Sequence, residues 1–330
     1  SDDVQITGLC TDSRRVKEGD LFFCYCGENF DSHEVAGDAV KNGAVALVCE
    51  KKCDLPVTQI VVGDGRAQIA HAARAFYGFP DKNLKIVGVT GTNGKTTTTY
   101  ILNEIFTANG NKTGLIGTLG IFYGEKRIAP ELTTPDPVYL YSVFSDMVKN
   151  GVEYVFMEVS AHALYYDKIN GINFEVGIFT NLTQDHLDFF GTMEAYAQSK
   201  KLMFANGRCK YAVLNSDDGL GIELLSFTKN SFGYGLDNPA DVFAVGIKES
   251  VSGTEMILNL FDELYEVKIN IPGIHNVYNA LAAATFAKLL GVKINTISAG
   301  LANLKRVSGR LERVASFGGG EIFVDFAHTP

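Results

Sequence analysis

The stretch Thr90-Gly-Thr-Asn-Gly-Lys-Thr-Thr97 restricts what this chain can fold into more than any other part of its sequence. It follows a short apolar run, residues 86–89, and opens a helical pattern that continues to about Asn109. Glycines let backbone N–H groups turn toward an anion, and the amino terminus of the following helix adds partial positive charge. The order of strand, loop and helix therefore predicts a nucleotide site in which Lys95 reaches the β- and γ-phosphates and Thr96 ligates Mg²⁺.

This loop is shorter than the usual phosphate loop. The pattern G-x-x-x-x-G-K-[ST] needs a glycine where this chain has Val89, so only G-x-x-G-K-T is present. The alternative interpretation is a glycine-rich turn beside an unrelated lysine. The strand before the loop and the helix after it favour the nucleotide site, which by itself is compatible with a kinase, a GTPase or an ATPase.

The chain divides at a segment rich in turn residues, 77–83, and this predicts two domains of class α/β. Residues 1–80 form the expected small mixed α/β domain. Residues 81–330 alternate strands and helices, which is typical of a mostly parallel sheet flanked by helices on both faces. Within it, alternating apolar and polar side chains over 231–271 predict an antiparallel excursion. The run 321–325 indicates a core strand, and because the sequence stops five residues later we expect a truncated protein.

Composition excludes several classes of partner. The chain of 330 residues has a net charge of −9 and no block of lysine and arginine, so nucleic acid is a poor candidate. No apolar run approaches the roughly 20 residues of a membrane span, and the amino terminus is too charged for a signal peptide. The six cysteines show no C-x-x-C pair, which is typical of reduced thiols. We expect a soluble cytoplasmic protein.

Two further polar motifs follow predicted strands. Glu158 comes directly after the run 154–157, and His186 lies in the segment that follows the run 176–179. Parallel sheets bind ligands at the carboxyl ends of their strands, so both motifs are expected near the phosphate loop, with Glu158 binding a divalent metal. Taken singly, a glutamate after a strand is usually a solvated loop residue, and a lone histidine is usually structural.

Motifs along the whole chain resemble those of the Mur ligase family, and they occur in that family's order. They are Gly91-Thr-Asn-Gly-Lys-Thr-Thr97, Leu132-Thr-Thr-Pro-Asp136, Met157-Glu-Val-Ser-Ala-His-Ala163, Thr183-Gln-Asp-His-Leu-Asp188, Gly273-Ile-His-Asn-Val-Tyr-Asn279, Gly309-Arg310 and Val324-Asp-Phe-Ala-His-Thr-Pro330. Thr11-Asp-Ser-Arg14, followed by Gly19-Asp-Leu-Phe22 and Gly27, resembles the uridine-binding domain of the family. The details are most similar to the members that form the tripeptide.

The resemblance implies an ATP-dependent amide-bond ligase of peptidoglycan precursor synthesis. ATP would phosphorylate the γ-carboxylate of D-Glu in UDP-MurNAc-L-Ala-D-Glu. The amine of a diamino acid, L-Lys or meso-diaminopimelate, would then displace phosphate from the acyl phosphate. Because two anions must be brought together, metals and cations have to offset their repulsion. The implied cofactors are ATP and two Mg²⁺ ions, and the implied assembly is a monomer.

The resemblance also assigns roles to residues. The implied catalytic residues are Lys95, Glu158, His186, Lys200 and Arg310. The implied metal site consists of Thr96, Glu158, His186 and Lys200, with a CO₂-derived carbamate on Lys200. The implied nucleotide contacts are Gly91, Thr92, Asn93, Gly94, Lys95, Thr96, Thr97, Asn276, Asn279, Arg310 and Asp325. The implied substrate contacts are Thr11, Ser13, Glu28, Asn29, Phe30, Thr133, Thr134, Ser160 and Lys168.

Several of these assignments have a structural alternative. Lys200 could be an ordinary surface lysine, and Lys201 beside it blurs the choice. Asn276 and Asn279 could simply cap a helix, and Ser13 could belong to a turn.

The chain departs from the family's pattern at four positions. Ala161 replaces the second serine of E-V-S-S-H, and Phe326 stands where tyrosine is usual. Tyr166 and Lys168 occupy positions where glutamine and arginine are common. Lysine keeps the positive charge of arginine but loses its two-pronged fork, so we expect rearranged dipeptide contacts.

Two alternatives and one expectation about activity remain. The family's third domain, which binds the incoming amino acid, is expected beyond residue 330, so we expect this chain to bind substrates without completing the reaction. One alternative is another member of the superfamily, such as the next Mur ligase or a folylpolyglutamate synthetase. The other is a nucleotide-binding module without catalytic activity.

Overall fold

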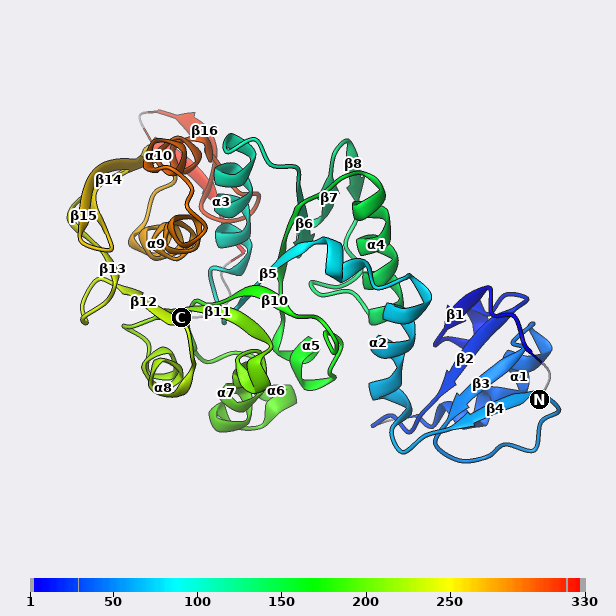
Figure 1. Cartoon of the computed structure of the whole chain (residues 1–330). Coiled ribbons are helices and arrows are strands. Elements are labelled where there is room, and N and C mark those ends of the chain that lie inside the picture. Colours follow the sequence, from blue (N-terminus) through cyan, green and yellow to red (C-terminus); the bar gives the residue numbers. More distant parts are fainter. Residues whose placement is uncertain (1–2, 29, 319, 327–330) are drawn as a thin grey trace. The chain divides into compact units, whose positions relative to one another are not determined.

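The structure of the protein is a computed structural model that describes residues 3–28, 30–318 and 320–326 (Figure 1). The chain folds into two compact units, and it enters the first of them three times. Unit 1 consists of Ser1–Pro80, Asp136–Ser145 and Tyr166–Gly171. Unit 2 consists of Asp81–Pro135, Asp146–Tyr165 and Ile172–Pro330.

Unit 1 is built on a four-stranded parallel sheet with the strands in chain order. The strands are β1 (Gly8–Cys10), β2 (Asp20–Cys24), β3 (Ala46–Cys49) and β4 (Thr58–Val61). Every residue of β2 is buried because both faces of the sheet are covered. Phe22 packs in the cluster that includes residues of α1 (Ala36–Lys41), whereas Phe23 packs against Ile69 of α2 (Gly65–Phe76) on the other face.

Unit 2 contains one sheet of eleven strands. They are β5 (Lys85–Thr90), β6 (Thr113–Gly117), β7 (Gly120–Tyr123), β8 (Lys126–Ile128), β9 (Tyr154–Glu158), β10 (Phe174–Phe179), β11 (Cys209–Asn215), β12 (Ser231–Gly235), β13 (Val242–Ser250), β14 (Gly253–Leu260) and β15 (Glu263–Ile269). Their spatial order is β15-β14-β13-β12-β11-β10-β5-β9-β6-β7-β8.

The predicted mostly parallel sheet with an antiparallel excursion is confirmed. The strands from β6 to β13 in that spatial order pair in parallel, and the two ends of the sheet, β7–β8 and β14–β15, are antiparallel. The expected limits of the excursion were too wide: β12 still pairs in parallel with both neighbours, so the antiparallel part begins at the β13–β14 hairpin.

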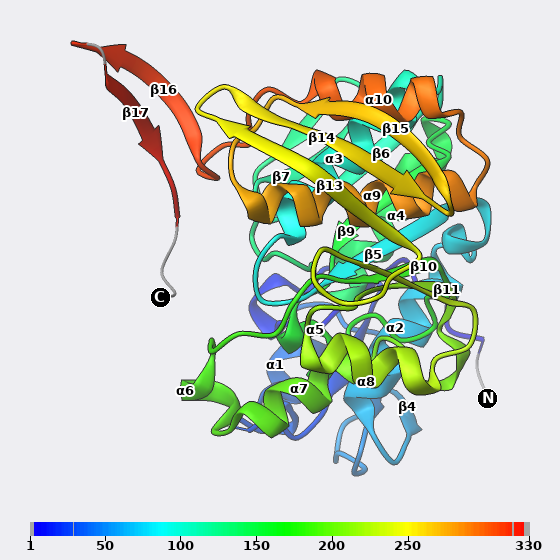
Figure 2. The same cartoon turned by 90° about the vertical axis from the view of Figure 1, so that its left-hand side faces the viewer.

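The helices of unit 2 fill the connections between strands. Their bounds are α3 (Lys95–Ala108), α5 (Ala161–Tyr165), α6 (Leu187–Phe190), α7 (Met193–Lys201), α8 (Gly219–Phe227), α9 (Ile274–Leu289) and α10 (Ile294–Asn303), and α4 (Pro137–Lys149) begins in unit 1. Figure 2 shows α3, α9 and α10 lying together beside the β13–β15 part of the sheet. Apolar residues of all three helices share one buried cluster with the strands, which fixes the amino terminus of α3 next to the ends of the parallel strands.

The contact between α10 and α3 depends on Gly300. A Cβ atom at this position would lie 2.4 Å from the Cα atom of Ile105, so the α3 backbone would have to move. We expect Gly300→Ala to lower the free energy of unfolding by about 1–3 kcal/mol, the usual cost of overpacking, despite the better helix propensity of alanine. Urea denaturation followed by circular dichroism measures this. Gly219→Ala is the control, because its Cβ atom would meet nothing within 4 Å; equal effects of both substitutions would contradict the packing argument.

The strand predicted over 321–325 is confirmed, but its expected position in the core is wrong. The residues form β17 (Gly320–Val324), which pairs only with β16 (Glu312–Phe317) in a separate two-stranded sheet (Figure 2). Ile322 is 47% and Val324 41% exposed, because no further layer covers this hairpin among the described residues. Across all the residues that the structure describes, no helix is both long enough and apolar enough to cross a bilayer.

Candidate functional site

The phosphate loop joins β5 to α3 and depends on two glycines. Gly91 and Gly94 have φ angles of 148° and 85°, in the region that disfavours other residues. A Cβ atom on Gly91 would lie 1.9 Å from the Thr180 hydroxyl oxygen, and one on Gly94 would lie 2.4 Å from the Asn279 side-chain oxygen. Both the backbone conformation and the available space therefore require glycine at the amino terminus of α3.

Lys95, the first residue of α3, closes this loop on itself. Its Nζ donates hydrogen bonds to the carbonyl oxygens of Gly91 at 2.8 Å and Thr92 at 2.7 Å. Burial lowers the pKa of Lys95, and the negative charge of Glu158 opposes that shift. The positive charge thus lies inside the loop where the phosphates of a nucleotide are expected, and it is anchored by carbonyl oxygens rather than by a counter-ion.

Glu158 ends β9, the strand next to β5, and is 2% exposed. Its Oε1 accepts hydrogen bonds from the Thr96 hydroxyl at 3.0 Å and the Thr118 backbone N–H at 2.9 Å. Its Oε2 accepts a hydrogen bond from the Thr118 hydroxyl at 3.0 Å. All of these donors are neutral, and no cation of the described residues forms an ion pair with the carboxylate, although the charge of Lys95 acts on it from a greater distance. Oxygen donors of this kind suit Mg²⁺.

Sequence reasoning missed two residues beside Glu158. Thr118 supplies two of the hydrogen bonds to its carboxylate, and Gly117 leaves the space for it, since a Cβ atom there would lie 2.1 Å from Oε1. Gly117 is the last residue of β6 and Thr118 follows it directly, and β6 pairs with β9 in parallel. A polar residue directly after a predicted parallel strand is the signal that could have found Thr118.

The predicted substrate residues Thr133, Thr134 and Ser160 are also brought next to Glu158. Thr134 donates from its hydroxyl to the Glu158 carbonyl oxygen at 2.9 Å and accepts a hydrogen bond from the Ser160 backbone N–H at 3.0 Å. The hydroxyl of Thr133 lies 3.1 Å from that of Thr118. A row of hydroxyl groups thus extends from the carboxylate.

The segment after β10 is tied to the phosphate loop by side chains. Asn181 accepts a hydrogen bond from the Asn93 backbone N–H at 2.9 Å, and the hydroxyl of Thr92 accepts one from the Thr183 backbone N–H at 3.0 Å. His186 follows with a left-handed φ of 52°. Its side chain is 46% exposed, and its ring lies 5.0 Å from that of His162. His186 therefore remains accessible at the end of a segment whose position is fixed.

Lys200 and Lys201 differ sharply in the structure. Lys200 is 1% exposed, and its Nζ lies 4.3 Å from the centre of the Tyr196 ring. Burial, together with the positive charge of Lys95, lowers the pKa of Lys200 well below its ordinary value. Lys201 instead pairs with Glu223 at 2.5 Å. Burial and the nearby charge of Lys95 thus both favour the neutral form of the Lys200 amine over its charged form.

Asn276 and Asn279 on α9 are buried and bonded within unit 2. The Asn279 side-chain oxygen accepts a hydrogen bond from the Thr98 hydroxyl at 3.2 Å, and its amide donates to the Asn276 side-chain oxygen at 3.1 Å. The Asn276 amide in turn donates to the Pro272 carbonyl oxygen at 2.7 Å. These bonds fix the start of α9 against α3, and Thr97 on α3 is likewise buried.

Arg310 and Asp325 lie at the hairpin end of unit 2. After burial, the positive charge of Arg310 also lowers the pKa of Lys95, so the two cations act on one another. Asp325 accepts a hydrogen bond from the Leu311 backbone N–H at 2.6 Å. Residues 327–330 of the last motif lie outside the described residues.

The predicted substrate residues of unit 1 do not all line one site. Thr11 and Lys168 line a cavity of about 240 Å³ within this unit. Ser13 begins a short 3₁₀ helix, and its carbonyl oxygen accepts a hydrogen bond from the Asn42 amide at 2.9 Å. Glu28 and Phe30 are exposed and do not line the cavity. Asn29 lies outside the described residues.

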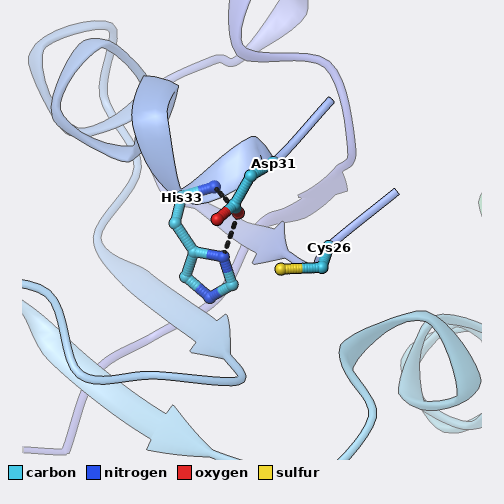
Figure 3. Close-up of side chains that lie close together, drawn as sticks. All are labelled: Cys26, Asp31 and His33. Atoms are coloured by element: carbon cyan, nitrogen blue, oxygen red, sulfur yellow. Dashed lines mark hydrogen bonds and ion pairs between the residues drawn. The ribbon is translucent and has the colours of Figure 1, made fainter. Parts of the chain in front are cut away.

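A second group of possible metal ligands lies in unit 1. Atoms of Cys26, Asp31 and His33 lie within 4.8 Å of one another (Figure 3). The His33 Nε2 accepts a hydrogen bond from the Glu50 backbone N–H at 3.0 Å, so its Nδ1 carries the proton and donates to Asp31 at 2.5 Å. The neutral ring has no lone pair left for a metal. Lys51 also pairs with Asp31, at 2.6 Å. This cluster therefore ties two loops together.

Comparisons with known families and proteins agree with one another. The Mur ligase middle domain matches residues 89–287, and the catalytic domain of the Mur ligase family matches residues 5–77. UDP-N-acetylmuramoyl-L-alanyl-D-glutamate–2,6-diaminopimelate ligase of Bacillus cereus is 43% identical over 334 residues, covering 99% of this chain and 68% of the relative. The protein of the same name from Halalkalibacterium halodurans is 43% identical over 330 residues, with 98% and 68% covered.

Solved structures show the same likeness. A structure of a UDP-N-acetylmuramoyl-L-alanyl-D-glutamate–2,6-diaminopimelate ligase has a TM-score of 0.84 at 26% identity and covers 94% of this chain and 65% of that one. MurF ligase from Thermotoga maritima in complex with ADP has a TM-score of 0.67 at 24% identity, with 96% and 70% covered, and shows the shared fold. The chain thus spans about two thirds of the length of these relatives.

Proposed function

Because the chain belongs to the Mur ligase family, we propose that it forms the ATP-binding and UDP-sugar-binding parts of a ligase that adds a diamino acid to UDP-MurNAc-L-Ala-D-Glu. Residues 1–80 would bind the uridine end, and residues 81–330 would bind ATP. The names of the similar proteins favour 2,6-diaminopimelate over L-lysine as the incoming amino acid. The single observation that carries the proposal is the buried Glu158 carboxylate beside the Thr96 hydroxyl at the phosphate loop.

The residues at the loop fit the expected chemistry. Glu158 and Thr96 would hold a Mg²⁺ ion, which when bound offsets the negative charge of the nucleotide and of the substrate carboxylate. Lys95 would hold the β- and γ-phosphates, with Arg310 adding positive charge. The hydroxyls of Thr134 and Ser160 would orient the dipeptide. His186 is the proposed further ligand for a second Mg²⁺, supported by its accessible side chain after a segment bonded to the loop.

We also place a CO₂-derived carbamate on Lys200. Only a neutral amine attacks CO₂, and its burial together with the Lys95 charge lowers the Lys200 pKa in the required direction. In buffer with ¹³C-bicarbonate, a carbamate signal is expected by ¹³C NMR at neutral pH. It should weaken as the pH falls through the lowered pKa, because protonation removes the nucleophile. Lys200→Met should abolish the signal and Lys201→Met should leave it; the reverse pattern would contradict the assignment.

Calorimetric titration tests the function as a whole. The chain should bind Mg²⁺-ATP, and it should bind UDP-MurNAc-L-Ala-D-Glu more tightly than UDP-MurNAc-L-Ala, because the site has to hold the D-Glu residue whose γ-carboxylate is activated. Thr134→Ala should reduce this preference. Binding of ATP with no binding of either UDP-sugar would instead support a nucleotide-binding module without ligase function.

A further inference from the structure

The cavity of unit 1 that Thr11 and Lys168 line is built from parts of the chain that are far apart in sequence. Thr11 follows β1, Tyr25 follows β2, Arg66 lies in the first turn of α2, and Tyr166 and Lys168 belong to the third segment of the unit. Its volume of about 240 Å³ suits part of a ligand rather than a whole nucleotide sugar. The lining brings together two cations, one carboxylate and two aromatic rings, so its charges decide which group it accepts.

Arg66 is held in this cavity by aromatic rings alone. Its guanidinium carbon lies 5.0 Å from the centre of the Tyr25 ring and 4.6 Å from that of the Tyr166 ring. Cations are attracted to ring faces at such distances. The Arg66 side chain makes no hydrogen bond or ion pair with any described residue. A half-buried guanidinium that lines a cavity and keeps its N–H donors free offers them to a ligand that brings acceptors.

The other cation of the cavity is already paired. Lys168 Nζ lies 2.7 Å from the Asp136 carboxylate, and both residues line the same cavity. Their charges offset one another, so Arg66 carries the uncompensated positive charge. An arginine at position 168, which is common in the family, would supply a guanidinium group with paired N–H donors. In this chain Arg66 supplies that group instead.

We propose that Arg66 is the anion-binding residue of this cavity, and that Tyr25 and Tyr166 hold its guanidinium in place for a phosphate or carboxylate group of the substrate. The planar guanidinium matches the paired oxygens of either group. This inference rests on the proposed function, since UDP-MurNAc-L-Ala-D-Glu carries both a diphosphate and peptide carboxylates. Tyr166 is a positioning residue: it replaces the family's common glutamine and supplies the nearer ring.

Calorimetric titration of the full 330-residue chain tests the role of Arg66. Three ligands are compared: UDP, UDP-MurNAc and UDP-MurNAc-L-Ala-D-Glu. Arg66→Gln should weaken binding of UDP-MurNAc-L-Ala-D-Glu about tenfold to hundredfold, as expected for lost hydrogen bonds to a charged group. Arg66→Lys should give a smaller loss, because it keeps the charge without the fork. An equal loss for UDP assigns the diphosphate, and a loss confined to the dipeptide ligand assigns a carboxylate.

Arg74→Gln is the matched control. It removes the same charge from the same helix, and its guanidinium also lies over a ring, 5.4 Å from the centre of Phe79, but it does not line the cavity. Its affinity for all three ligands should stay within about twofold of wild type. Mg²⁺-ATP titrations and thermal melts of each variant show whether the chain is folded.

The Tyr166 variants separate positioning from mere packing. Tyr166→Phe keeps the ring and should bind like wild type, whereas Tyr166→Gln should weaken binding and make it less sensitive to the Arg66→Gln change. If wild type binds the dipeptide ligand and a folded Arg66→Gln variant binds it equally well, this inference is overturned while the proposed function stands. If the wild-type chain binds none of the UDP ligands, the proposed function fails, and this inference fails with it.

Discussion

Replacing Lys95 with methionine should weaken ATP binding by about 100-fold or more. The Nζ atom now bonded to the carbonyls of Gly91 and Thr92 is the group that would turn to the phosphates. Each hydrogen bond to a charged group contributes about 1.5–3 kcal/mol, and tenfold in affinity corresponds to about 1.4 kcal/mol. Titration calorimetry with Mg²⁺-ATP measures the loss.

Lys85→Met is the matched control for this prediction. Lys85 begins the same strand, β5, that leads to the phosphate loop, and its Nζ donates to the Tyr154 hydroxyl at 3.0 Å. The same change in charge and size at this end of the strand should leave ATP affinity within about twofold of wild type. Equal losses in both variants would mean that general charge, and not the loop, governs nucleotide binding.

Glu158→Gln should abolish the dependence of ATP binding on Mg²⁺ without destabilising the fold. Removing one partner of a buried charge pair costs about 3–5 kcal/mol, which is at least about 100-fold in the affinity for Mg²⁺ in the presence of ATP. In the protein without ligands, the same substitution should leave the free energy of unfolding unchanged or raise it. All the donors to Glu158 are neutral, and Lys95 attracts it only from beyond ion-pair distance, so glutamine keeps most of the hydrogen bonds and avoids burying a charge.

Two measurements test this contrast between binding and stability. ATP titrations with and without Mg²⁺ give the binding effect, and urea denaturation without ligands gives the free energy of unfolding, which should be unchanged or higher. Gly117→Ala is the companion variant: its Cβ atom would displace the carboxylate while leaving its charge, and it should weaken Mg²⁺-ATP binding as well. A Glu158→Gln protein that is less stable yet binds Mg²⁺-ATP normally would show that Glu158 is structural.

The sequence by itself determined the elements whose signals are local. A strand, a glycine-rich loop and a helix are contiguous in the chain, so the phosphate loop and the role of its two glycines follow from spacing alone. Glu158 was placed at the edge of the sheet because parallel strands end together there. The alternation of apolar and polar residues predicted the antiparallel hairpins. β12 lies in the same alternating stretch and still pairs in parallel, because the alternation within a strand does not specify its partner or their relative direction.

Only the tertiary structure decided what depends on neighbours distant in the chain. The resemblance assigned the carbamate to Lys200 while Lys201 beside it blurred the choice, and burial and the charge of Lys95 set Lys200 apart only in the structure. Thr118 reaches Glu158 because β6 and β9 are adjacent. Arg66 meets the ring of Tyr166 because the chain returns twice to unit 1. The burial of a side chain, the shift of its pKa and the balance of charge around it all depend on every surrounding group. They are therefore set only once the fold has brought those groups together.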